Sequence, residues 1–304
     1  MSVMEILKQR FALSFEVSPP KTDVGMEKLC ASGGTLERLY TLKPDAVSCT
    51  YGFGGSNLGK SLEVLDKVVR DGKTLGITHF ICTGNTRESA AGQLTSFLNR
   101  GIDHVLLQQG DLPEGRKRAG GEQLDAAEVA CSIRQMFGSR FTIGVNGFSE
   151  GRCSIAEDVE SLRRKGDSGA DYIVTRLCWD MEKFYRWLDA VLAADIRMPI
   201  VAGVMPVADQ AATIHAALAA NGGVLPDSLA RLVSQNWIYP NPFVKDPFDP
   251  EADRKKAAFR SAGMEYTVSQ ILAYRACGIS GIHLLTNNGF DDAAHIVKHA
   301  GLRT

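Results

Sequence analysis

A carboxylate at the end of a predicted strand is the feature of this sequence that most directly indicates chemistry. Residues 11–18 alternate large apolar side chains with small or polar ones, and Pro19 and Pro20 follow. Alternation with a period of two is typical of a β-strand, and proline ends it because proline cannot donate to a sheet ladder. Glu16 therefore lies at the carboxyl end of the strand, on the face that carries Ala12 and Ser14. We expect this face to line a barrel, whose catalytic groups gather at the carboxyl ends of the strands.

A second carboxylate, Asp111, follows the fourth predicted strand. Two carboxylates held in different environments can act as an acid and a fixed charge. Because Glu16 has phenylalanines beside it, we expect its pKa to be raised and Glu16 to donate a proton. The structural alternative for Glu16 is a salt bridge to a loop lysine such as Lys21.

Polar residues also follow the other predicted strands, and basic residues end the helix after the fifth strand. The strand-end residues are Thr50, Tyr51, Gln109, Gly110, Arg176 and Asn288, and the basic pair is Arg164 and Lys165. Such a pair either neutralises a phosphate or complements a helix C-terminus. His79 is either a ligand-binding residue or a hydrogen-bonded core histidine.

Eight strand-like segments alternate with helical patterns along the whole chain. The strands are expected near residues 11–18, 46–51, 77–83, 104–109, 142–147, 172–178, 200–205 and 281–286. The helices are expected near residues 26–42, 60–71, 87–100, 124–137, 156–168, 181–194, 210–220 and 264–277, with a short helix before the first strand. Eight strand–helix units predict an α/β fold, a (β/α)8 TIM barrel formed as a single domain by residues 1–304. An aromatic and proline-rich insertion at about 235–250 forms either a lid over the barrel mouth or a surface excursion.

Composition and charge exclude several functional classes. The 304 residues carry a formal net charge of −1, so we expect no nucleic-acid partner, and no apolar run is long enough to form a membrane helix. The seven cysteines contain no C-x-x-C pair, which argues against a zinc site and for a reducing compartment. We therefore expect no metal and a cytoplasmic location.

Six motifs in register resemble those of the methylenetetrahydrofolate reductase family. Phe15-Glu16-Val-Ser-Pro-Pro-Lys21 is similar to the family's F-E-x-x-P-P-[KR], Ser48-Cys-Thr50-Tyr51-Gly52 to S-V-T-Y-G, and Gly110-Asp111-Leu-Pro113 to the end of R-G-D-x-P. Phe148-Ser-Glu150-Gly151-Arg152 stands where the family has Y-P-E-G-H, Thr175-Arg-Leu-Cys-Trp-Asp180 resembles T-Q-L-F-F-D, and Gly203-Val-Met-Pro-Val207 resembles G-I-L-P-V. Order and spacing hold from about residue 11 to about residue 289.

The resemblance implies a flavoprotein that reduces 5,10-methylenetetrahydrofolate to 5-methyltetrahydrofolate with NADH or NADPH through bound FAD. By matching position, Glu16 would be the general acid that helps open the five-membered ring, and Asp111 would act beside the flavin and the pterin. The positions that match flavin contacts are Thr50, Tyr51, His79, Gln109, Gly110, Asp158, Arg164 and Lys165. The positions that match folate contacts are Asp111, Arg176 and Asn288. We expect a homo-oligomer.

The sequence departs from the family pattern at several contact positions. Arg176 stands where the family has the glutamine that holds the folate, Gln109 replaces an arginine of the flavin loop, and Gly289 replaces an arginine that helps bind the folate. Two alternatives therefore stay open. One is a related barrel oxidoreductase with weakened or absent flavin or a different C1-pterin substrate, and the other is a non-catalytic folate- or flavin-binding protein.

Overall fold

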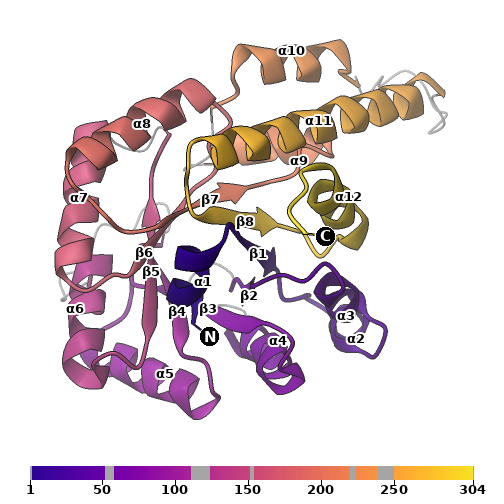
Figure 1. Cartoon of the computed structure of the whole chain (residues 1–304). Helices are drawn as coiled ribbons and strands as arrows, with labels where there is room; N and C mark the ends of the chain where they lie inside the picture. Colours follow the sequence, from indigo (N-terminus) through magenta and orange to yellow (C-terminus); the bar gives the residue numbers. More distant parts are fainter. Residues whose placement is uncertain are drawn as a thin grey trace.

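The computed structural model describes residues 2–51, 58–110, 124–150, 154–219, 224–238 and 250–303. Eight parallel strands close into a barrel in sequence order, and helices surround it (Figure 1). The predicted (β/α)8 barrel is therefore confirmed. Asp111 and most of the proline-rich insertion, residues 239–249, lie outside the described residues, so the lid hypothesis stays a prediction.

All eight strands lie where the alternation and the apolar runs predict them. Their bounds are β1 (Ala12–Val17), β2 (Ala46–Cys49), β3 (Leu75–Ile81), β4 (His104–Gln108), β5 (Thr142–Gly147), β6 (Tyr172–Thr175), β7 (Ile200–Val204) and β8 (Gly281–Leu285). The closing pair is β1 with β8, which sets Ser14 opposite His283 and Glu16 opposite Leu285. Residues distant in sequence thereby become neighbours inside the barrel.

The two faces of each strand have different environments, as the period of two requires. Outward residues of β1, Leu13, Phe15 and Val17, are fully buried in the main core between the sheet and the helices. Inward residues form a separate cluster that fills the barrel near the amino-terminal ends of the strands. Its strand members are Ala12, Ala46, Ile77, Leu106, Tyr172, Val174 and Val201.

The short helix α1 (Val3–Gln9) closes the amino-terminal end of the barrel. Its residues Val3, Ile6 and Leu7 belong to the inward cluster. Tyr172 fits into the lumen because Gly144 faces it: a Cβ at Gly144 would lie 2.6 Å from the Tyr172 ring, closer than real side chains approach. The barrel is thus a packed core at its amino-terminal end. A site that a ligand can enter is therefore expected at the carboxyl ends of the strands.

The helices follow the predicted pattern with four differences. Their bounds after α1 are α2 (Asp23–Cys30), α3 (Thr35–Tyr40), α4 (Leu58–Asp71), α5 (Arg87–Asn99), α6 (Ala126–Phe137), α7 (Ile155–Asp167), α8 (Met181–Ala193), α9 (Gln210–Leu218), α10 (Asp227–Gln235), α11 (Pro250–Ala276) and α12 (Phe290–His299). The single helix expected at 26–42 is two helices, because Gly33 between them adopts a φ of +73° that ends a right-handed helix. Helices α10 and α12 were not predicted.

Helix α11 is about twice the length that the sequence predicted at 264–277, because it begins at Pro250. Proline is compatible with the first helical position, where its missing N–H would have no partner within the helix. The end of the proline-rich segment is therefore a helix start.

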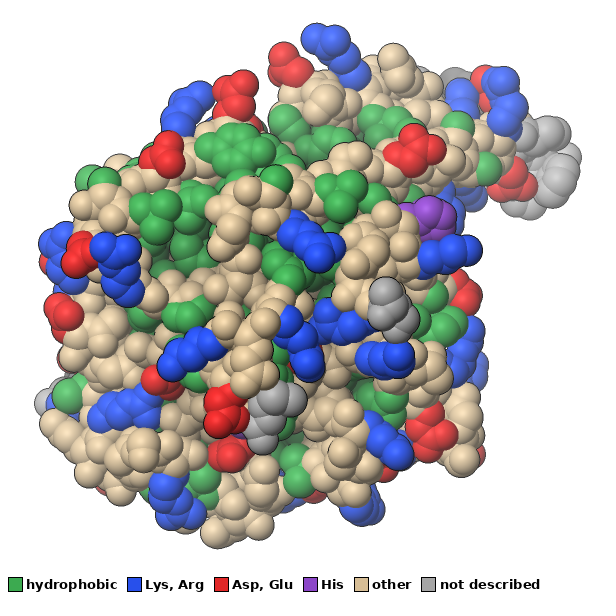
Figure 2. All heavy atoms as spheres, viewed as in Figure 1, with side chains coloured by type: hydrophobic (Ala, Val, Ile, Leu, Met, Phe, Trp, Pro, Cys, Tyr) green, Lys and Arg blue, Asp and Glu red, His purple; other side chains and the backbone are tan. Residues whose placement is uncertain are grey.

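The outer surface shows no single-signed face in the view of Figure 2. Lysine, arginine, aspartate and glutamate side chains all occur on this face, and several of the basic ones gather near the centre of the view. Among the described residues, none of the helices combines the length and the apolar character needed to cross a membrane.

Candidate active site

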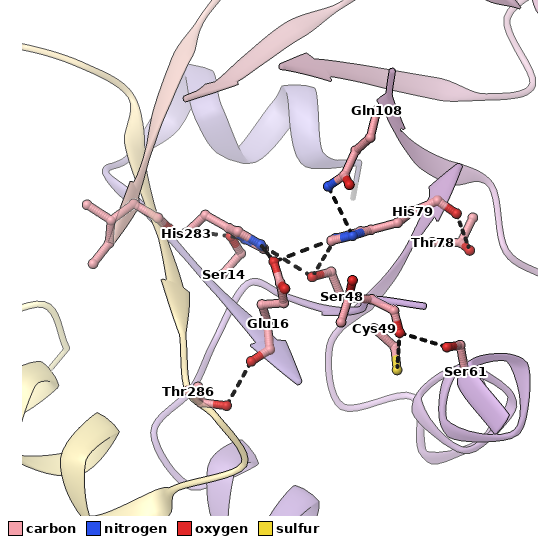
Figure 3. A network of polar contacts seen from close by, with 12 residues as sticks. Ser14, Glu16, Ser48, Cys49, Ser61, Thr78, His79, Gln108, His283 and Thr286 are labelled. Atoms are coloured by element: carbon pink, nitrogen blue, oxygen red, sulfur yellow. Dashed lines mark hydrogen bonds and ion pairs between the residues drawn. The ribbon is translucent and has the colours of Figure 1, made fainter. Parts of the chain in front are cut away.

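Glu16 lies between two buried histidines at the carboxyl end of the barrel (Figure 3). Its Oε2 is 3.1 Å from Nε2 of His283 on β8 and 3.8 Å from Nε2 of His79 on β3. The backbone carbonyl of Glu16 accepts hydrogen bonds from both the N–H (3.0 Å) and the hydroxyl of Thr286 (2.8 Å), which fixes the end of β1 against the end of β8. Glu16 is therefore held by histidines, and the alternative of a salt bridge to Lys21 is wrong.

The expectation of a raised pKa for Glu16 is also wrong. Burial favours the neutral acid and is the largest single influence, but His79, His283 and Arg176 together lower the pKa of Glu16 below its ordinary value. Burial in turn lowers the pKa of His79 to about 4, against the attraction of Glu16. Near neutral pH, Glu16 is therefore ionised and His79 is neutral.

Each histidine has a polar partner on its other ring nitrogen. Nδ1 of His283 lies 2.7 Å from the Ser14 hydroxyl, and Nδ1 of His79 lies 3.1 Å from the Gln108 amide. The Ser48 hydroxyl is 3.3 Å from Nε2 of each ring. These contacts orient both rings so that their Nε2 atoms face Glu16.

A cavity of about 320 Å³ opens above this cluster, at the carboxyl ends of the strands. Its lining includes Glu16, Thr50, Gln108, Asn146, Arg176 and His283, with apolar walls from Leu177, Met205 and Ala216. Glu16 keeps 18% of its side chain exposed, whereas His79 keeps 1%. A ligand in the cavity therefore meets the carboxylate directly, while His79 acts from behind it.

Arg176 enters the cavity from a loop that the surrounding structure holds tightly. Its N–H donates to the carbonyl of Gly147 at 2.9 Å. Two residues later, the carbonyl of Cys178 accepts from the Gln270 amide (2.6 Å) and the Tyr274 hydroxyl (2.7 Å), both on α11. Helix α11 thereby fixes the loop that carries Arg176.

Glu150 holds the same loop from the β5 side. Its carboxylate accepts from the N–H of Trp179 at 3.2 Å, and its side chain is fully buried. Burial raises the pKa of Glu150, although Lys183 opposes this. Arg176 is thus positioned by two neighbouring segments.

A second cavity, of about 120 Å³, lies beside the first and shares Asn146 with it. Its lining includes Gln109, Phe148, Arg164 and Lys165. The Lys165 ammonium donates to the carbonyl of Asn146 at 2.9 Å and lies 5.9 Å from the Phe148 ring centroid, and Arg164 pairs with Asp125. Two cations, an aromatic ring and an amide therefore meet at the ends of β4 and β5.

Three residues predicted to contact a cofactor also have structural roles. The hydroxyl of Tyr51 accepts from the N–H of Ile81 at 2.7 Å. Buried Asp158 accepts from the Trp187 indole at 2.7 Å and from the N–H of Phe148 at 3.1 Å. Gly110 has a φ of +78°, and a Cβ there would lie 2.4 Å from Ile81. They shape the rim of the site, and their contact with a cofactor stays a prediction.

Asn288 does not line the described cavities. Its amide donates to the carbonyl of Ser18 at 2.8 Å and accepts from the N–H of Ser18 at 3.0 Å. This pair of bonds joins the chain after β8 to the chain after β1. The predicted substrate contacts of Asn288 and Asp111 stay predictions, and Asp111 lies outside the described residues.

Sequence reasoning missed His283 and Ser48 as members of the site, and it assigned no role to Ser14 or Gln108. One signal was available: His283 is the sole polar side chain in the strand Gly281–Leu285 and stands at an inward position. Its pairing with Glu16 was not readable, because the two positions are 267 residues apart and meet only when β8 closes on β1.

The match to a family model decides the affiliation of the chain. Residues 2–301 match the model described as methylenetetrahydrofolate reductase. The chain belongs to the methylenetetrahydrofolate reductase family. The resemblance seen in the sequence motifs is thereby confirmed over nearly the whole chain.

Curated relatives carry the same name at moderate identity. Methylenetetrahydrofolate reductase 1 of Schizosaccharomyces pombe is 28% identical over 301 residues, which cover 97% of this chain and 47% of that protein. Methylenetetrahydrofolate reductase (NADH) 1 of Arabidopsis thaliana is 27% identical over 306 residues, with 96% of this chain and 48% of that one covered. The chain thus spans about half the length of these relatives. The 5,10-methylenetetrahydrofolate reductase of Escherichia coli is 29% identical over 201 residues, covering 65% of each chain.

A solved structure shares the fold. An uncharacterized protein from Clostridium thermocellum, described as binding two copies of 5-methyl-5,6,7,8-tetrahydrofolic acid, superposes with a TM-score of 0.60 at 15% identity and covers 98% of this chain and 97% of its own. At this identity the likeness supports the barrel architecture alone.

Proposed function

We propose that this protein reduces 5,10-methylenetetrahydrofolate to 5-methyltetrahydrofolate, with hydride supplied by NADH or NADPH through bound FAD. Membership of the methylenetetrahydrofolate reductase family supports the reaction. The observation that carries the proposal is the placement of Glu16, a carboxylate that faces the barrel-mouth cavity, with His283 beside it in the cavity lining and His79 behind it.

Glu16 is the proton donor of the proposed reaction. It would protonate the ring nitrogen that leaves the methylene carbon when the five-membered ring opens. Because its neighbours lower the pKa of Glu16, a proton has to reach the carboxylate before or during substrate binding. Glu16 keeps 18% of its side chain exposed and lines the barrel-mouth cavity, so solvent in that cavity can supply the proton. A ligand that covers the cavity also removes water from Glu16, which favours the neutral acid.

Arg176 orients the folate in this proposal. Its position in the cavity lining brings a cation close enough to lower the pKa of Glu16. A guanidinium presents several donors in a fixed plane, which suits a carbonyl or carboxylate of the substrate. The apolar walls at Leu177, Met205 and Ala216 suit an aromatic ring system.

The second cavity, of about 120 Å³, admits only part of a flavin nucleotide, and its residues suit the phosphate-bearing part. Lys165 and Arg164, which pairs with Asp125 of the same lining, provide positive charge for phosphates, Phe148 provides an aromatic face, and Gln109 provides an amide. A bound flavin would supply the hydride chemistry, and the protein supplies binding and electrostatics. Because the second cavity shares Asn146 with the first, a group held there lies next to the folate position. The cytoplasmic location and the homo-oligomer stay predictions.

The visible absorption spectrum of the purified protein, followed through two half-reactions, tests the proposal. We expect a yellow protein that NADH or NADPH bleaches and that methylenetetrahydrofolate recolours. If a colourless protein still reduces methylenetetrahydrofolate, FAD is not its cofactor. If the protein is coloured but does not turn over, the proposed enzymatic function is refuted.

A further inference from the structure

Three side chains from three distant strands bring metal-ligating atoms together beneath the cavity. Glu16, His79 and His283 each offer one such atom, and these atoms all lie within 4.8 Å of one another. In the described part of the chain, this is the one group of three or more histidine, cysteine or acidic side chains with that arrangement. Two imidazoles and one carboxylate form a donor set that binds zinc, iron, cobalt and nickel. Magnesium and calcium instead prefer sites made of oxygen ligands alone.

We propose that Glu16, His79 and His283 form a binding site for a divalent transition-metal ion of the zinc class. Ligand atoms about 2.1 Å from a tetrahedral metal stand about 3.4 Å apart. The Oε2 of Glu16 is 3.1 Å from Nε2 of His283 and 3.8 Å from Nε2 of His79. The two distances from Glu16 are therefore close to the spacing that an ion requires, and the two ring nitrogens lie within 4.8 Å of each other.

The second nitrogen of each ring is held as metal sites require. A ligating imidazole usually donates its other N–H to a neighbouring oxygen, which fixes the ring and its tautomer. Nδ1 of His283 lies 2.7 Å from the Ser14 hydroxyl, which itself donates to the Ile282 carbonyl at 3.4 Å. Nδ1 of His79 lies 3.1 Å from the amide of Gln108, whose oxygen and nitrogen can exchange places by rotation. Both rings thus have an acceptor for Nδ1–H, which leaves the Nε2 lone pairs free to bind an ion.

The position of the cluster leaves room for further ligands. Glu16 and His283 line the cavity of about 320 Å³, so water molecules or substrate atoms have access to an ion held between them. The hydroxyl of Ser48 is 3.3 Å from Nε2 of both rings and hydrogen-bonds the cluster when no ion is bound. Three protein ligands and an open side are the arrangement of reactive rather than purely structural metal sites.

Occupancy of this site has a consequence for the proposed reaction, and this part of the inference rests on the proposed function. A metal ion on Oε2 of Glu16 occupies the lone pair that would carry the donated proton. We therefore expect Zn²⁺ to inhibit folate reduction and a chelator to restore it. Reduction of the flavin by the nucleotide needs no proton from Glu16 and should continue.

Binding is tested without substrate or flavin, by titrating the chelator-treated protein with Co²⁺ and recording its visible absorption. His295 and His299 first have to be removed as a competing pair, since they lie one turn apart on α12 with their rings stacked at 3.9 Å. In the His295→Ala/His299→Ala background we expect one Co²⁺ per chain. Adding Glu16→Gln or His283→Ala should abolish the signal, and Gln108→Ala should weaken binding roughly ten- to hundred-fold.

Ser48→Ala serves as the matched control, because it alters the same cluster without removing a ligand, and it should keep the Co²⁺ signal. Thermal unfolding checks that each variant is folded, and if His283→Ala is not, the isosteric Glu16→Gln decides. An unchanged Co²⁺ affinity in Glu16→Gln, no binding at all, or intense thiolate-to-cobalt absorption would each overturn the proposed site. None of these outcomes bears on folate reduction, which the half-reactions test separately.

Discussion

The buried histidine behind Glu16 should make the stability of the protein depend on pH. His79 is 1% exposed, and burial lowers its pKa from the ordinary 6.5 to about 4. Between these two values the unfolded chain binds a proton at this residue and the folded chain does not. The contribution of His79 to stability is therefore fully present above pH 6.5 and is lost as the pH falls toward 4.

The magnitude follows from the two pKa values. A difference of about 2.5 between the folded and unfolded pKa corresponds to at most ~3.4 kcal/mol. The linkage relation gives a loss of ~2 kcal/mol between pH 7.5 and pH 5.0 and ~3 kcal/mol by pH 4.0. Glu16 also has a lowered pKa. Its contribution to stability is likewise lost on acidification, but only when the pH falls below the ordinary pKa of a glutamate. Burial also lowers the pKa of His295, so the contribution of His79 in the window from pH 7.5 to 5.0 is obtained from a variant that removes this ring alone.

Urea unfolding at several pH values in this window, with EDTA present, provides the assay. His79→Gln keeps a polar side chain but cannot titrate, so its unfolding free energy should fall by ~2 kcal/mol less than that of the wild type between pH 7.5 and 5.0. His215→Gln on the exposed face of α9 is the matched control and should retain the wild-type pH dependence. Equal losses in wild type and His79→Gln would refute the reasoning, because the buried ring would then contribute no linked proton.

Three further substitutions test other parts of the structure. Glu16→Gln should slow folate reduction by about 10²–10⁴-fold while flavin reduction by the nucleotide stays intact, and stopped-flow half-reactions that lose rate equally would contradict the assigned role. Arg176→Ala should raise the folate KM. Because Arg176 lowers the pKa of Glu16, the substitution should also shift the pH profile of folate reduction to higher pH. An unchanged KM in steady-state kinetics would show that Arg176 does not bind the substrate. Asp45→Ala should destabilise the fold by about 3–5 kcal/mol, because buried Asp45 accepts from the N–H of Leu13 at 2.8 Å and pairs with Arg10 and Arg303. Urea unfolding measures this loss. A loss below about 1 kcal/mol would show that the ion pairs contribute little to stability.

Local pattern was sufficient to locate the strands. The alternation in residues 11–18 and the apolar runs of the other strands correspond to the eight strands observed. It was also sufficient to place Glu16 at the carboxyl end of β1 and facing the lumen, because a strand alternates its faces regardless of its neighbours. Helix bounds were less accurate where a glycine or a proline decides them, as the break at Gly33 and the early start of α11 at Pro250 show.

The environment of Glu16 was not predictable in the same way. Phenylalanines next to it in sequence suggested an apolar pocket and a raised pKa, but Phe15 points outward into the core between sheet and helices. The neighbours that matter, His79 and His283, come from β3 and β8 and reverse the direction of the pKa change. Sequence neighbours on a strand face opposite sides, so they are a poor guide to the charge around a side chain.

The sequence alone therefore determined the alternation of strands and helices, the inward direction of Glu16 and, through motifs in register, the family. Only the closed barrel decided which polar groups meet: it set β8 against β1, gathered Glu16, His79 and His283 within 4.8 Å, and enclosed two adjoining cavities. The physical reason is the distance along the sequence over which each influence acts. Period and propensity act over a few residues, whereas electrostatic and hydrogen-bonding partners are chosen by the register of strands more than 200 residues apart.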